Sequence, residues 1–88
     1  MFAKEVIAAL RPSLPAQTLD HVGFALEDGR IAQALIEAVD GAVAHQIVVP
    51  VRVYDMVRDR ATDGVSFRSK DARRLERCLR RLRTDAER

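Results

Sequence analysis

Apolar residues recur at helical spacing near the start of the chain. In residues 2–11 they lie three and four positions apart, which places their side chains on one face of a helix. Pro12 and Pro15 follow at once, and proline lacks the amide hydrogen that a helix interior requires. The pattern therefore predicts a first helix over residues 2–11 that ends at this proline pair.

Two further apolar stripes predict a second helix over residues 16–27 and a third over residues 30–44. Gly29 separates them, because glycine readily takes the backbone conformation that ends a helix. Gly41 weakens the last turn of the third helix, so an end near Asp40 is an alternative.

The next segment has conflicting signals. Residues 47–53 are mostly β-branched, which favours a strand. Pro50 argues against a central strand but suits the first turn of a helix. We predict a helix over residues 50–61. The alternative is a β-hairpin over residues 47–67, which would make the fold α+β.

The last helix is predicted by an apolar seam with spacings of three, four, three and four residues. Ser69 or Ser66 is the expected N-cap. The seam consists of Ala72, Leu75, Leu79, Leu82 and Ala86. Two heptads are too short to require a coiled coil, so we expect the seam to pack on the other helices. The predicted fold is all-α, a compact bundle of four or five short helices.

Length and composition place the chain among small globular proteins. Its 88 residues suffice for one domain, and we assign residues 1–88 to a single helical domain. Hydrophobic residues make up 48% and charged residues 32%, a balance typical of folded chains. Thirteen arginines against two lysines indicate a GC-rich, bacterial-like coding sequence.

Location follows from the absence of export signals. No apolar run approaches the ~20 residues needed to cross a bilayer, and Glu5 stands where a secretory signal would be basic. Cys78 is the only cysteine, so no disulfide can form within the chain. We expect a cytoplasmic protein without a membrane partner.

Charge is distributed unevenly along the chain. Residues 1–64 carry six basic and nine acidic side chains, whereas residues 65–88 carry nine basic and four acidic ones. On the last predicted helix, five arginines fall within an arc of about 120° opposite the apolar seam. This arginine face consists of Arg73, Arg74, Arg77, Arg80 and Arg81. The acidic counter-surface that we predict consists of Asp20, Glu27, Asp28, Glu37 and Asp40.

Like charges on one face repel one another, so the arginine face indicates an anionic partner. Our leading hypothesis is a protein-protein interaction module, an adaptor or a homo-oligomer, in which the arginine face meets an acidic surface. The alternative is a nucleic-acid-binding or regulatory protein that places the same face on phosphates. A third interpretation gives the arginine face no partner. In that case the face is an ordinary solvent-exposed helix surface, and the helical ion pairs Glu76–Arg80 and Arg81–Asp85 balance part of its charge.

Catalytic and metal-binding patterns are missing from the sequence. His21, His45 and Cys78 lie far apart and lack the short ligand spacings of zinc sites. The glycines are dispersed, so no phosphate-binding loop is evident. We therefore expect no enzyme activity, no cofactor, no metal and no small-molecule substrate.

Overall fold

Five α-helices make up most of residues 2–85, the part of the chain that the computed structural model describes. The elements in order are α1 (Phe2–Leu10), the 3-10 turn η1 (Arg11–Ser13), α2 (Ala16–Glu27), α3 (Ile31–Ala44), β1 (Val48–Val49), α4 (Val51–Thr62), α5 (Ser69–Arg81) and β2 (Arg83–Thr84). The all-α fold is confirmed. The hairpin alternative is wrong, because residues 51–62 are helical and the only strands in the described range are two residues long.

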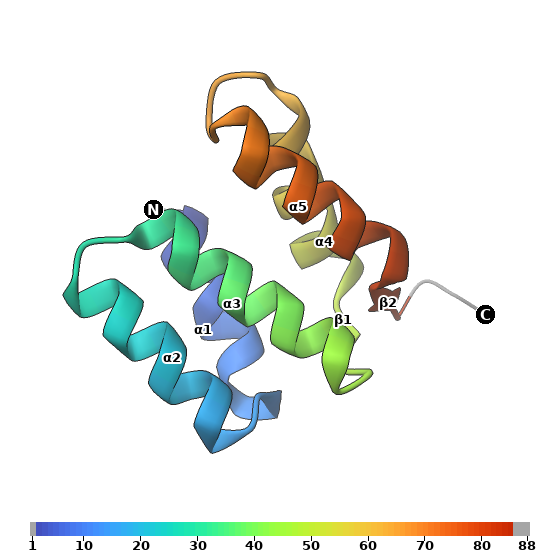
Figure 1. The fold of residues 1–88 in the computed structure, drawn as a ribbon. Coiled ribbons are helices and arrows are strands. Elements are labelled where there is room, and N and C mark those ends of the chain that lie inside the picture. Colours follow the sequence, from blue (N-terminus) through green and yellow to red (C-terminus); the bar gives the residue numbers. More distant parts are fainter. Residues whose placement is uncertain (1, 86–88) are drawn as a thin grey trace.

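Helix α3 is the central helix of the bundle. It contributes more buried residues than any other described element: Ala34, Leu35, Ile36, Ala38, Val39, Gly41 and Ala42. Helix α2 packs on one side of α3 and α5 on another, while α4 lies against α5 and α1 (Figure 1). The solvent-exposed faces of α2 and α5 therefore lie on different sides of the molecule.

Close packing explains why α3 runs past Gly41 to Ala44 instead of ending near Asp40. Gly41 is buried against α2, and a Cβ there would lie 2.7 Å from the Cγ2 of Thr18. The glycine therefore allows the two helices to approach closely and does not end α3.

The C-terminal segment differs from the prediction. Helix α5 ends at Arg81, and Leu82 is extended (ψ 136°) although its side chain stays buried. Residues 83–84 form β2, which pairs in parallel with β1. The prediction that Leu75, Leu79 and Leu82 are core residues is therefore confirmed. The prediction that the helix continues through Leu82 is wrong, because α5 ends at Arg81. Ala86 lies outside the described residues.

Asp85 connects this segment to the start of α4. Its Oδ1 accepts a hydrogen bond from the backbone N–H of Val51 at 3.0 Å, and its own N–H donates to the carbonyl of Val49 at 3.2 Å. The first backbone N–H groups of a helix have no partner within the helix. A carboxylate 34 residues further along the chain therefore caps α4.

The turn between α4 and α5 corrects the predicted N-cap. Arg68 precedes the first residue of α5 and forms no side-chain capping bond, so neither serine is the cap. Ser66 instead bonds to Asp63, whose Oδ1 accepts the N–H groups of Val65 and Ser66, each at 2.8 Å. Gly64 completes the turn with φ 76°. The Asp63 carboxylate thus orders the connection that leads into α5.

The Asp63 turn predicts a pH-dependent contribution to stability. Its hydrogen bonds to Ser66 and Val65 lower the pKa of Asp63 from 3.8 to about 2. Because the folded state favours the carboxylate, this stabilisation is complete above about pH 4 and disappears as the pH falls toward 2. We expect Asp63→Ala to lower the melting temperature at neutral pH, and we expect the gap from wild type to narrow between about pH 4 and 2. Carbon-13 NMR titration of Asp63 measures the pKa directly, and a midpoint near 3.8 would contradict this assignment.

Candidate functional site

Helix α5 separates apolar from basic side chains. Leu75, Cys78 and Leu79 are buried against the core, and Leu75 is fully inaccessible. All five residues of the arginine face are exposed. The seam therefore turns inward and the guanidinium groups reach solvent, as the spacing predicts.

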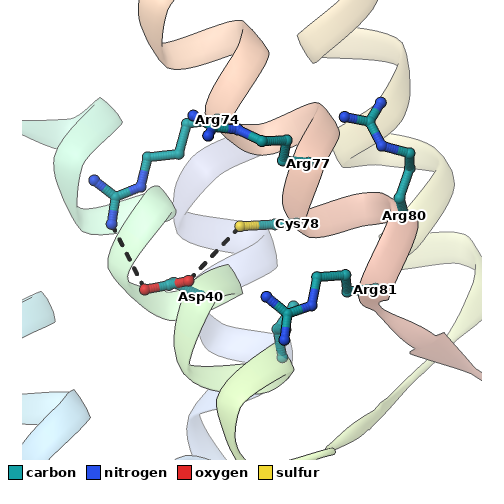
Figure 2. Close-up of a pocket in the computed structure, with 7 residues that line it drawn as sticks. Asp40, Arg74, Arg77, Cys78, Arg80 and Arg81 are labelled. Atoms are coloured by element: carbon teal, nitrogen blue, oxygen red, sulfur yellow. Dashed lines mark hydrogen bonds and ion pairs between the residues drawn. The ribbon is translucent and has the colours of Figure 1, made fainter.

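Four of these arginines surround one open pocket between α3 and α5. Its volume is about 470 Å³, and the residues that line it are Asp40, Val43, Arg74, Arg77, Cys78, Arg80 and Arg81 (Figure 2). Arg74 and Arg81 extend from α5 toward Asp40 on α3, whereas the guanidinium group of Arg80 points away from Asp40 (Figure 2). We call this hollow the arginine pocket. Arg73 is not among its lining residues and lines an adjacent hollow on the outer side of α5.

Little of this positive charge is neutralised within residues 2–85. Arg74 lies 3.6 Å from the Oδ2 of Asp40, a partly exposed ion pair. No described carboxylate pairs with Arg77, Arg80 or Arg81. The two helical pairs expected from the sequence do not form in the described structure. Glu76 makes no ion pair with Arg80, and Asp85 caps α4 because the helix has already ended. The arginine pocket therefore keeps a net positive charge.

The pocket wall also contains apolar groups. Val43 contributes from α3 and Cys78 from α5. The thiol of Cys78 donates to the Oδ1 of Asp40 at 3.8 Å. Burial, and then the nearby charge of Asp40, raise the pKa of Cys78 above its usual value. The thiol thus stays protonated at neutral pH, and Cys78 contributes packing and a weak hydrogen bond instead of a reactive thiolate.

The structure divides the predicted acidic counter-surface. Asp40 lies in the arginine pocket beside Arg74. Glu37, on α3, accepts a hydrogen bond from the Nε2 of Gln33 at 2.7 Å and lies 3.9 Å from the Nδ1 of His21. These two carboxylates therefore have partners within the fold.

The other three acidic residues lie on α2 or directly after it. Asp28 pairs with Arg30 at 3.0 Å. Asp20 and Glu27 are exposed on the outer face of α2 and pair with no other residue of the described range. The part of the acidic counter-surface without partners is therefore the outer face of α2. Helix α3 lies between α2 and α5, which carries the arginines of the pocket (Figure 1).

Sequence reasoning missed one apolar member of that outer face. Phe24 is 62% exposed, although phenylalanine is usually buried. On a helix it lies about 160° from buried Val22 and within about 60° of Asp20 and Glu27. The signal was present in the sequence as an aromatic residue outside the apolar stripe of residues 16–27.

Other kinds of site find no support in the described range. Residues 2–85 contain no group of three or more His, Cys, Asp or Glu side chains placed to hold a metal ion. In the same range, no helix combines the length and apolarity that a membrane span requires.

The sequence matches no model of a protein family, and neither a curated protein nor a solved structure is significantly similar to it. Function must therefore be argued from the arginine pocket itself.

Proposed function

We propose that this protein is a non-catalytic interaction module whose arginine pocket docks an acidic segment of a protein partner. One observation carries the proposal. The pocket is open to solvent, is bordered by four arginines of which only Arg74 has an ion-pair partner in residues 2–85, and has apolar groups on its wall.

The energetics favour an anionic occupant. Two unit charges a few ångströms apart repel by about 1 kcal/mol in water, and more where the surrounding protein excludes solvent. Arg77, Arg80 and Arg81 lie within four residues of one another on α5, so their like charges add to the positive potential at this end of the helix. Carboxylates between them replace repulsion with attraction, and guanidinium groups bind carboxylates with two parallel hydrogen bonds.

The pocket suits an acidic protein segment better than a nucleic acid. Val43 and Cys78 provide an apolar patch for a side chain, which a sugar-phosphate backbone does not exploit. No aromatic side chain is among the lining residues, so stacking with bases has no platform. The net negative charge of residues 1–64 would also repel an extended polyanion.

The direct test is peptide binding measured by fluorescence anisotropy. The probe is an unrelated helical peptide rich in glutamate with one central phenylalanine, and its partner probe carries glutamine at every glutamate. We expect the acidic probe to bind and the neutral one not to bind. We also expect affinity to fall as salt rises from about 0.05 M to about 0.5 M, where the Debye length shortens severalfold. Arg77→Glu with Arg81→Glu should weaken binding by more than about tenfold, because two attractive charges become repulsive.

A matched control separates the pocket from overall charge. Arg11 and Arg52 are exposed and lie outside the arginine pocket, so Arg11→Glu with Arg52→Glu changes the net charge by the same amount. This control should retain binding within about twofold, as expected for charges remote from the contact. Equal losses in both double variants would refute a specific pocket. Tighter binding of random duplex DNA than of the acidic peptide, lost with Arg77→Glu and Arg81→Glu, would favour the nucleic-acid alternative.

A further inference from the structure

The outer face of α2 has the chemistry that the arginine pocket requires. Asp20 and Glu27 are exposed and make no ion pair within residues 2–85. Phe24 lies between them and is 62% exposed. Among the large apolar side chains of the described residues, only Val48, Val51 and Val65 share such exposure, and none of these lies on α2. We call Asp20, Phe24 and Glu27 the α2 stripe.

The spacing of the α2 stripe equals that of three groups along α5. Asp20, Phe24 and Glu27 follow one another at intervals of four and three residues, and Arg74, Cys78 and Arg81 do the same. Each set spans about 10.5 Å along its helix at a rise of 1.5 Å per residue. When the two helices run parallel, carboxylate therefore meets guanidinium at both ends and the phenyl ring meets the apolar wall between them.

We propose that the occupant of the arginine pocket is α2 of a second copy of this chain, docked parallel to α5. Phe24 packs on Val43 and on the small exposed part of Cys78, with Glu27 toward Arg81 and Asp20 toward Arg74, whose guanidinium group Asp20 then shares with Asp40. Arg77 and Arg80 also line the pocket and add positive charge to it. This inference rests on the proposed function and specifies its partner.

The fold prevents a molecule from filling its own pocket. Helix α3 lies between α2 and α5 (Figure 1), and the arginines that line the pocket belong to α5. Each copy therefore offers one stripe and one pocket, and the contact joins two different surfaces. Such a heterologous contact repeats from copy to copy, which produces head-to-tail chains or a closed ring. We expect wild-type protein to grow beyond a dimer as its concentration rises and to dissociate at high salt.

Two complementary variants test this arrangement by sedimentation velocity and multi-angle light scattering. The stripe variant combines Asp20→Asn, Phe24→Ala and Glu27→Gln, and the pocket variant combines Arg77→Glu and Arg81→Glu, so the two altered surfaces are not complementary to each other. Each should be monomeric alone at a concentration where wild type associates. Their equimolar mixture should form a 1:1 complex and nothing larger, because only one intact pocket and one intact stripe remain. Val65→Ala, which changes an exposed apolar residue between α4 and α5, should associate like wild type.

The outcomes distinguish this inference from the proposed function. Circular dichroism first checks that both variants keep wild-type helix content, as expected for solvent-facing substitutions. A wild type that is monomeric at every concentration and salt, or a mixture that stays monomeric, overturns the second-copy inference. If the unrelated acidic peptide still binds the pocket in that case, the proposed function stands and only its occupant is wrong. If neither contact forms, both are wrong.

Discussion

Replacing Leu75 by alanine is expected to lower the free energy of unfolding by about 2–5 kcal/mol. Leu75 is fully inaccessible, and it lies on the helix that packs against both α3 and α4. The truncation removes apolar contacts and leaves a cavity that rigid helices fill only in part. Small domains have about 5–15 kcal/mol of stability in total, so this one change removes a large share. Urea denaturation followed by circular dichroism measures the loss.

The same substitution links the core to the arginine pocket. Leu75 faces inward while Arg74 and Arg77, close to it on α5, face the pocket. Weaker anchoring of α5 should therefore reduce peptide binding before the rest of the bundle melts. Val65→Ala is the control, because an 86% exposed side chain should contribute less than about 0.5 kcal/mol. A loss below about 1 kcal/mol for Leu75→Ala would mean that α5 is not anchored on the core at this residue.

Helices were predictable where a local signal determines them. Pro50 precedes α4 and fixes its start, and the period of apolar residues identifies α5. The end of α5 was not predictable, because Leu82 continues the apolar spacing beyond Arg81. The chain leaves the helix there to pair with β1 and to place Asp85 on α4. Those contacts join segments about 34 residues apart, and no local pattern encodes them.

The arginine face was predictable because its members lie on one helix, where angular position follows from spacing. The pocket was not, because part of its wall comes from α3. Asp40 illustrates the difference. By charge alone it joins the other carboxylates of residues 17–49, whereas packing of α3 on α5 places it beside Arg74. Identifying which acidic residues are free to bind a partner therefore requires tertiary structure.

Gly41→Ala is expected to destabilise the protein by about 1–3 kcal/mol. In an exposed helix interior this change ordinarily stabilises by about 1 kcal/mol, because alanine restricts the unfolded chain. At Gly41 the new Cβ would lie 2.7 Å from the Cγ2 of Thr18 and 3.3 Å from the Cδ2 of Leu14. Threonine is β-branched, and the Oγ1 of Thr18 also lies 3.4 Å from the new Cβ, so the side chain presents two atoms to this position. Relief requires α2 to move off α3.

Gly23 provides the matched comparison for Gly41. It lies inside α2, and a Cβ there meets nothing within 4 Å, so Gly23→Ala should stabilise the protein by about 0.5–1 kcal/mol. Thr18→Ala removes the methyl group that the new Cβ of Gly41→Ala would strike, so in the double variant most of the loss should be recovered. Equal stabilisation by Gly41→Ala and Gly23→Ala would contradict close contact between α2 and α3. That contact also sets the direction in which Asp20, Phe24 and Glu27 face, so Gly41→Ala should weaken head-to-tail association while leaving the arginine pocket able to bind an acidic peptide.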